Sequence, residues 1–294
     1  MTINLSRIGI EANHDIDKFW EILESRTNLC IETLHCRHDI LKGTKAKVAP
    51  ELWMYGAIAR LDAEDVIDPL LYHPYSTISV GYVGGHEMCM ALLGKSITSK
   101  EGEKLMLDVV KYLRKRCDEE KEKTGIGFSL YATPAESLVH KFSASNRSHF
   151  GIIEGVTDKE YITNSFHVNV CEEIDAFSKL RFESQFPLYS SGGNISYIET
   201  PFMQNNLKAL ESIVKYGNEH AVYFELNTKL DTCFECGFKG EMMITDELTW
   251  ECPSCGNTNK SKMQTLRRTC GYLGDNDFNK GKTQELKERV VHLN

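Results

Sequence analysis

The chain has 294 residues, 41% of them hydrophobic and 26% charged, with a formal net charge of -8 at pH 7. Its length and hydrophobic content suffice for one large domain or two ordinary ones, each with a buried core. The absence of any run of about 18 apolar residues, and of the basic-then-apolar order of a signal peptide, argues against membrane insertion and secretion. The negative charge argues against broad binding to nucleic acid, although Lys260, Lys262, Arg267 and Arg268 form a small basic group.

Two long amphipathic helices are predicted in the N-terminal half. Apolar residues recur at helical spacing over residues 15–41. A second helix is expected to begin near Thr98, because Thr98 and Glu101 have the spacing of a capping box. The run RKRCDEEKEK is typical of the solvated end of that helix, before Gly125.

The stretch GIGFSLYATPAES predicts a strand that runs directly into a helix. Apolar residues alternate over residues 126–130, Thr133 can cap a helix, Pro134 suits its first turn, and Glu136 completes a capping box. The free N–H groups of a helix start attract anions, so this junction is a candidate phosphate site. An ordinary junction, of which every α/β protein has several, is the competing interpretation.

Helices and strands continue to alternate downstream, which indicates an α/β fold. A helix over residues 201–216 is expected to end at Gly217, and AVYFELN then predicts a buried strand. The segments STISVGYVGGHE, residues 76–87, and SSGGNISYIET, residues 190–200, each combine a strand with a glycine turn. The glycines of the first do not have the spacing of a dinucleotide fold.

Two Cys-x-x-Cys pairs, each followed by glycine, form the strongest local pattern. They comprise Cys233, Cys236, Cys252 and Cys255. Two residues between thiols let both sulfurs face one ion, and the glycine lets the backbone bend around it. Four thiolates would close a tetrahedral zinc shell, which predicts a structural zinc ribbon. The alternatives are a four-thiolate iron centre, two redox thiol pairs, or cysteines that are merely buried. The chain has ten cysteines in all, and the others lack a disulfide framework, as expected in a reducing cytoplasm.

The stretch RRTCGYLGD, residues 267–275, begins about a dozen residues after the last of these cysteines. Taken alone, Gly271 is a turn glycine beside an incidental thiol, Cys270. A metal module just upstream would hold the base of this loop rigidly.

A zinc ribbon followed by RRTCGYLG resembles the C-terminal end of the anaerobic ribonucleoside-triphosphate reductases, a glycyl-radical family. The segments TINLSRIGIEA, STISVGYVGGHE, YATPAES, TNSFHVNV and SSGGNISYIE extend the resemblance over nearly the whole chain. It implies an α/β fold that is part of a ten-stranded barrel, with a C-terminal zinc ribbon and radical loop. The implied division is residues 1–227 for half of the barrel, 228–260 for the ribbon, and 261–294 for the radical loop and tail.

The resemblance implies that Gly271 stores a glycyl radical. In this family a radical-SAM activase, with a 4Fe-4S cluster and S-adenosylmethionine, removes a Cα hydrogen, and glycine suits the resulting planar centre because it has no side chain. The radical then makes a thiyl on a finger-loop cysteine, which takes the 3′ hydrogen of a ribonucleoside triphosphate. Formate commonly supplies the reducing equivalents, and the products are the 2′-deoxyribonucleoside triphosphates used in DNA replication.

The resemblance covers only the C-terminal half of such a reductase, whose preceding part carries an ATP cone and the finger-loop cysteine. No matching context surrounds Cys30, Cys36, Cys89, Cys117 or Cys171. We therefore expect this chain, either one part of a split reductase or a fragment, to be catalytically incomplete and to bind a separate N-terminal chain. That chain would cover the exposed strand edges of the half-barrel. The assembled cytoplasmic enzyme is expected to be a homodimer.

Substrate contacts follow from the resemblance. The YATPAES junction is expected to receive substrate phosphates, with Thr133, Ala135 and Glu136 as contacts. His86 with Glu87, and His167, are candidates for polar groups near the substrate, although hydrogen-bonded structural histidines are the favoured interpretation.

Two functions from other classes remain as alternatives. A spare-part protein that donates a glycyl-radical domain to a damaged enzyme needs only the final segment, whereas the resemblance extends far upstream. A nucleic-acid-binding zinc ribbon predicts a basic face, yet residues 226–294 carry as many acidic as basic side chains.

Next to Gly271, Tyr272 is expected to pack the loop, and Cys270 either relays a hydrogen atom or fills space.

Overall fold

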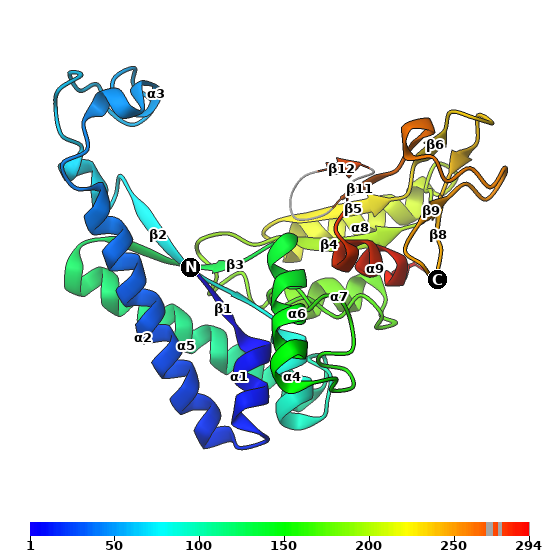
Figure 1. Ribbon diagram of the computed structural model, residues 1–294, viewed down its shortest axis with the longest axis horizontal. Coiled ribbons are helices and arrows are strands. Elements are labelled where there is room, and N and C mark those ends of the chain that lie inside the picture. The colour runs from blue at the N-terminus through cyan, green and yellow to red at the C-terminus, as the bar shows by residue number, and fades with distance from the viewer. Residues whose placement is uncertain (269–272, 276–277, 294) are drawn as a thin grey trace.

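Figure 1 shows the fold as a computed structural model, which describes residues 1–268, 273–275 and 278–293. The helices in these residues are α1 Leu5–Ala12, α2 Ile16–Leu41, α3 Pro50–Trp53, α4 Gly85–Leu93, α5 Lys100–Thr124, α6 Ser137–Phe150, α7 Ala176–Glu183, α8 Leu207–His220 and α9 Lys280–Glu288. The strands are β1 Thr2–Asn4, β2 Thr77–Val83, β3 Gly127–Ala132, β4 Ser196–Thr200, β5 Phe224–Thr228, β6 Asp231–Cys233, β7 Lys239–Gly240, β8 Met243–Ile244, β9 Trp250–Glu251, β10 Met263–Gln264, β11 Leu266–Arg268 and β12 Leu273–Asp275.

Parallel strands run through the N-terminal part of the molecule. Strands β1, β2 and β3 are neighbours in that order, and β4 pairs in parallel with β5. The segment before β4 contacts β3, because the Gly192 N–H donates to the Leu130 carbonyl over 2.7 Å and the Ala132 N–H donates to the Gly193 carbonyl over 3.1 Å. Parallel strands joined by helices confirm the predicted α/β class.

The largest core lies between the first sheet and helices α1, α2, α4 and α5. Phe19 and Leu23 of α2, Met106 and Val110 of α5, and Leu130 of β3 are fully buried in it. Each such side chain contributes about 1.5–3 kcal/mol on burial. This packing fixes the carboxyl ends of the three parallel strands along one edge, where open α/β sheets bind ligands.

Three helix boundaries in the structure differ from their predicted positions. Helix α5 is capped by Ser99, whose side chain accepts from the Gly102 N–H, because Thr98 instead donates its hydroxyl to Glu172. Helix α6 begins at Ser137, so the prediction that Thr133 caps it is wrong. The predicted boundaries of the helix over 201–216 are also wrong: α8 starts and ends later and passes through Gly217.

The other elements agree with the sequence pattern. Residues 15–41 form α2 with its cap, and Gly125 ends α5 in the left-handed conformation, with φ 72°. The predicted strands in residues 76–87 and 190–200 are β2 and β4, and AVYFELN contributes β5; the prediction that this strand is buried is wrong, because only Asn227 of its residues is buried. None of the helices in the described ranges is long and apolar enough to span a membrane.

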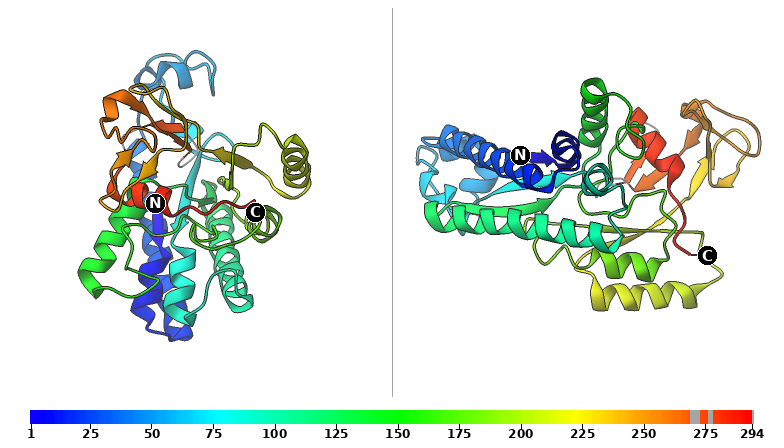
Figure 2. Two further views of the ribbon diagram at one scale, coloured as in Figure 1. Left: turned by 90° about the vertical axis from the view of Figure 1, so that its right-hand side faces the viewer. Right: turned by 90° about the horizontal axis from the view of Figure 1, so that it is seen from below.

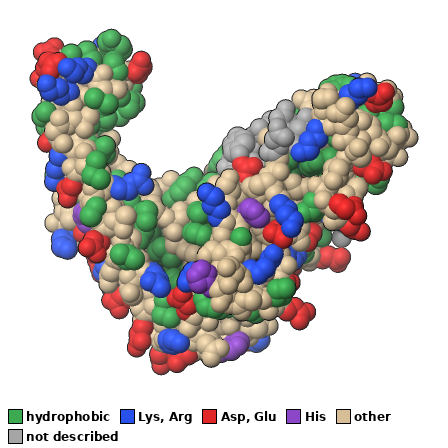
Figure 3. Space-filling view, viewed as in Figure 1, with side chains coloured by type: hydrophobic (Ala, Val, Ile, Leu, Met, Phe, Trp, Pro, Cys, Tyr) green, Lys and Arg blue, Asp and Glu red, His purple; other side chains and the backbone are tan. Residues whose placement is uncertain are grey.

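Two parts of the chain project from this body. Residues 46–71, which include α3, extend from the end of α2, and the small antiparallel strands β6 to β10 form a module beyond β5 (Figures 1 and 2). In the space-filling view the surface between the two projections is concave (Figure 3). A groove beside the first residues of β2 is lined by Met1, Leu34, Ile40, Leu41 and Ile78, among other residues.

Candidate metal centre and adjoining hairpin

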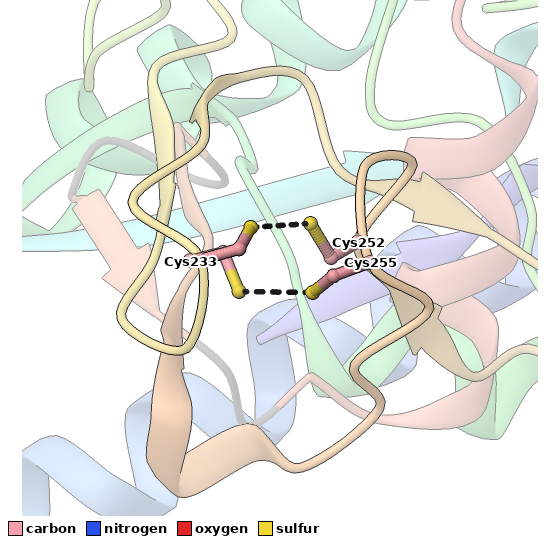
Figure 4. A group of neighbouring side chains, drawn as sticks. Cys233, Cys252 and Cys255 are labelled. Carbon is pink, nitrogen blue, oxygen red and sulfur yellow. Dashed lines mark hydrogen bonds between the residues drawn. The ribbon is translucent and has the colours of Figure 1, made fainter.

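The four predicted cysteines come together in the C-terminal module. All four Sγ atoms lie within 4.8 Å of one another, with 3.8 Å between Cys233 and Cys255 and 3.7 Å between Cys236 and Cys252 (Figure 4). A tetrahedral site with zinc–sulfur bonds of about 2.3 Å has sulfur–sulfur edges of about 3.8 Å. The sulfur positions therefore fit a zinc ion, and they are too far apart for disulfides, in which the sulfurs are about 2.05 Å apart.

The glycine after each cysteine pair bends the backbone as the sequence predicts. Gly237 and Gly256 are left-handed, with φ 75° and φ 70°. Their N–H groups donate over 2.9 Å to the carbonyls of Cys233 and Cys252, respectively. A residue with a Cβ atom is strained at such a φ, so glycine is required for this tight turn.

Hydrogen-bond donors around Cys233 favour its thiolate, the form that binds a metal. Burial raises the pKa of the Cys233 thiol, but the backbone N–H groups of Cys236 and Glu235 and the side chain of Asn257 lower the pKa to about 6. The Asn257 amide nitrogen lies 3.6 Å from Cys233 Sγ. The Asn257 backbone N–H lowers the pKa of the Cys255 thiol, but burial and the other three cysteines raise it to about 12, so the hydrogen-bond donors favour the thiolate at Cys233 and not at Cys255.

Strands β11 and β12 form an antiparallel hairpin that directly follows the metal module. Leu266–Arg268 pairs with Leu273–Asp275. Residues 269–272 connect the two strands and lie outside the described residues, so the predictions for Cys270, Gly271 and Tyr272 fall on positions without a structural description. The described strands fix where that connection begins and ends.

A buried ion pair joins the hairpin to the metal module. Arg267 of β11 makes two parallel hydrogen bonds to Asp231 of β6, with 2.6 Å between Nη2 and Oδ2, and its guanidinium lies 5.1 Å from the ring centre of Trp250. The Asp231 carboxylate also accepts from the backbone N–H groups of Leu266 and Met242, over 3.1 and 2.8 Å. These contacts make the ribbon and the hairpin base one packed unit.

Two further contacts hold the end of β11. The Arg268 side chain pairs with Glu225 of β5, and the Arg268 carbonyl accepts from Nη1 of Arg289 over 3.1 Å. Arg289 follows α9, so residues from β5, from the metal module and from the C-terminal tail converge on this hairpin.

The predicted phosphate-binding junction lies at the carboxyl end of β3. The Thr133 hydroxyl is 3.5 Å from the Thr2 hydroxyl at β1, and the Ala135 N–H donates to the Asn164 side chain over 2.7 Å. Glu136 stands at the N-cap of α6 without capping it through its side chain. The Ala135 amide is thus already paired, and the free N–H groups of this junction belong to the first turn of α6.

The candidate histidines have different surroundings. His167 is buried, and its Nε2–H donates to the Ile195 carbonyl over 2.6 Å, while burial lowers its pKa. Glu87 accepts from both the N–H and the hydroxyl of Thr163, each over 2.7 Å. Nδ1 of His86 is buried without a hydrogen-bond partner among the described residues. These contacts favour a structural role for His167 and Glu87.

A buried polar network near the hairpin is absent from the sequence-based predictions. It surrounds a cavity of about 40 Å³, large enough for ordered water, and includes Lys179, Glu199, Glu285, Arg289 and His292. Glu285 pairs with Lys282 and Arg289, and these cations, which outweigh the effect of burial, lower its pKa to about 2. The only sequence signal was the helical spacing of the charges at Lys282, Glu285 and Arg289, in α9 and directly after it, which is also typical of an exposed helix.

A family model for anaerobic ribonucleoside-triphosphate reductase matches residues 1–292. Among curated relatives, the anaerobic ribonucleoside-triphosphate reductase of Escherichia coli (strain K12) is 43% identical over all of this chain and 42% of its own length. The protein of the same name from Enterobacteria phage T4 is 41% identical over 99% of this chain and 48% of its own length. The chain thus spans less than half of the curated relatives that it matches.

Solved structures show the same fold at lower sequence identity. An anaerobic ribonucleotide reductase structure superposes with a TM-score of 0.68 and 22% identity, covering 98% of this chain and 41% of the other. The Thermotoga maritima enzyme in complex with dATP and CTP gives a TM-score of 0.66 at 23% identity, covering 97% of this chain and 43% of the other.

Proposed function

The chain belongs to the anaerobic ribonucleoside-triphosphate reductase family, and from this premise we propose that it is the radical-bearing part of such a reductase, with Gly271 as the radical residue. The observation that carries the proposal is the position of Gly271 in the connection of a hairpin whose base is tied to the four-cysteine site by the Asp231–Arg267 pair. A glycine that stores the radical requires a firmly held hairpin base, because the unpaired electron must return to the same residue in every turnover.

Glycine is suited to this role by its backbone chemistry. Removal of one Cα hydrogen leaves an unpaired electron shared with the flanking amide groups, which requires a flat centre, and a side chain would clash with that geometry. We propose that a radical-SAM activase, with its 4Fe-4S cluster and S-adenosylmethionine, removes the hydrogen. Tyr272 would pack the loop, and Cys270 stands next to the radical position.

The ion held by the four cysteines is proposed to be structural zinc. Cys233, Cys236, Cys252 and Cys255 would supply all four ligands, which leaves no coordination position for a substrate. A bound zinc would therefore supply folding free energy to the ribbon, proposed as residues 228–260, rather than catalysis. The contact between Asp231 and Arg267 would connect the ribbon to the segment of residues 261–294.

We place the substrate at the carboxyl ends of the parallel strands. Thr133, Ala135 and Glu136 remain the proposed contacts for substrate phosphates, and the adjacent N-terminus of α6 offers N–H groups and a favourable dipole. Because the Ala135 N–H already donates to Asn164, the Thr133 hydroxyl and the first turn of α6 would carry most of the anion contact. The substrate class is ribonucleoside triphosphates, and the products are their 2′-deoxy forms, with formate as the reductant.

The rest of the enzyme is proposed to come from a separate N-terminal chain with the ATP cone and the thiyl cysteine. One feature supports such a partner: among the described strands, β1 lies at the edge of its sheet beside an apolar groove. Residues 1–227 would supply half of a ten-stranded barrel, and the partner would pair with the edge. We expect the assembled enzyme to be a cytoplasmic homodimer.

An anaerobic spin-resonance experiment tests the proposal. The chain is incubated with the activase, a reductant and S-adenosylmethionine, and a doublet signal is expected that disappears in Gly271→Ala. Cys36→Ser, at an exposed cysteine of α2, is the control variant and should keep the doublet. A doublet that survives Gly271→Ala would exclude Gly271 as the radical residue.

A further inference from the structure

Arg289 occupies an unusual position for a residue so close to the C-terminus. Its side chain is buried between two carboxylates, with 3.0 Å from Nη1 to Glu199 of β4 and 2.8 Å from Nη2 to Glu285 of α9. The second hydrogen of Nη1 is directed at the Arg268 carbonyl, 3.1 Å away. One guanidinium thus connects the barrel strand, the last helix and the hairpin.

The backbone on the C-terminal side of Arg289 is fixed independently of the hairpin. The Val290 N–H donates to the Val170 carbonyl over 3.0 Å, and the His292 N–H donates to the Glu199 carbonyl over 2.9 Å. The Glu199 N–H in turn donates to Nδ1 of His292 over 2.8 Å. Arg289 is therefore anchored first to β4 and its surroundings, and it reaches from there to β11.

The charges around Arg289 are balanced within the buried cluster. Glu199 also accepts from the Asn227 amide, and Glu285 pairs with the fully buried Lys282. Desolvating four charges is costly, and a hydrophobic cluster would often be as stable. The ionic arrangement provides what a hydrophobic cluster lacks: a directed, charged donor for a main-chain carbonyl three residues before Gly271.

We propose that Arg289 is a positioning residue for the radical loop, which sets the backbone of β11 at Arg268 and thereby the location of Gly271. This inference rests on the proposed role of Gly271. The ribbon holds β11 through the side chain of Arg267, whereas Arg289 holds the main chain itself, at the last described residue before the connection. Arg289 touches no reacting atom in this scheme and acts only through the hairpin.

Arg289→Lys is the informative substitution. A lysine keeps the positive charge between Glu199 and Glu285, but a single ammonium cannot serve two carboxylates and a carbonyl in the planar geometry of a guanidinium. Loss of a hydrogen bond from a charged donor corresponds to roughly a ten- to hundredfold change in the equilibrium constant for docking of the hairpin. Arg116→Lys is the matched control, because the Arg116 guanidinium likewise joins a carboxylate, that of Glu119, to a second element, at the Asn28 side chain of α2, but lies on α5, which packs on α4 and β3.

Amide hydrogen exchange on the full chain measures hairpin docking without any activation. Peptides that cover Leu266–Arg268 and Leu273–Asp275 should exchange at least tenfold faster in Arg289→Lys than in the wild type, and at the wild-type rate in Arg116→Lys. Unchanged exchange in Arg289→Lys, or equal acceleration in both variants, would overturn the proposal.

The activated chain provides the functional readout. With activase and S-adenosylmethionine, Arg289→Lys should give a radical that is installed to a lower yield or decays about tenfold faster, while Arg116→Lys matches the wild type. Equal yield and lifetime in Arg289→Lys would contradict a positioning role. A wild-type chain with no Gly271-dependent signal would instead refute the proposed function, and hydrogen exchange would still decide whether Arg289 orders the hairpin.

Discussion

Replacing Asp231 with Asn should uncouple the hairpin from the metal module. The substitution removes one partner of a buried pair: the side chain of Asp231 is 0% exposed and that of Arg267 is 6% exposed. It leaves the Arg267 guanidinium buried without a counter-charge and weakens the acceptors for two backbone N–H groups. Breaking one side of a buried pair costs about 3–5 kcal/mol, which is large against the 5–15 kcal/mol stability of a typical domain.

The assay combines urea unfolding with the rate at which a chelator removes the bound metal. The matched control is Glu235→Gln in the same module, because the Glu235–Lys262 pair is half-exposed, at 50% and 53%, and should contribute no more than about 1 kcal/mol. Asp231→Asn should lower the free energy of unfolding by several times the control and speed metal release. Equal effects in the two variants would show that the Asp231–Arg267 pair does not couple the ribbon to the hairpin.

Three further predictions follow from the same contacts. Cys252→Ser should abolish stoichiometric zinc in metal analysis, whereas Cys36→Ser, at an exposed cysteine outside the cluster, should leave it unchanged; retained zinc in Cys252→Ser would contradict a four-thiolate site. Tail docking should weaken in acid: the pKa of Glu285 is lowered to about 2 and burial lowers that of His292 to about 3, so both groups stabilise the folded state at neutral pH. The contribution of His292 is lost as pH falls below about 6.5, and that of Glu285 is lost as pH falls from about 4.5 to about 2. For Glu285 the lost stability amounts to about 3 kcal/mol. A Glu285→Gln variant with the same acid unfolding curve would contradict this account. Oxygen should cut the activated chain at Gly271, and the C-terminal piece should co-elute with the body in native size exclusion, because Lys282, Leu286 and Arg289 are buried; prompt release would show that the tail contacts are weak.

Local sequence determined the features that depend on neighbouring residues. The Cys-x-x-Cys-Gly pattern predicted both knuckles, because two intervening residues and a left-handed glycine are sufficient to direct two thiols at one point. The periodicity over residues 15–41 likewise predicted α2. The motif around Gly271, and nearly full-length similarity to the reductases, pointed to the family that the family model matches.

Only the tertiary structure decided how distant charges are paired. Helix α5 is capped by Ser99 and not by Thr98, because the Thr98 hydroxyl is bound by Glu172, which lies far along the chain. Local propensity likewise predicted a cap at Thr133, whereas α6 starts only at Ser137. Lys282, Glu285 and Arg289 have the spacing of an exposed helix, and they are buried because α9 packs against α6 and β8 and Arg289 pairs with Glu199 of β4. Pairings such as Asp231 with Arg267 and Glu199 with Arg289 span many residues, and a sequence pattern of short period carries no information about them.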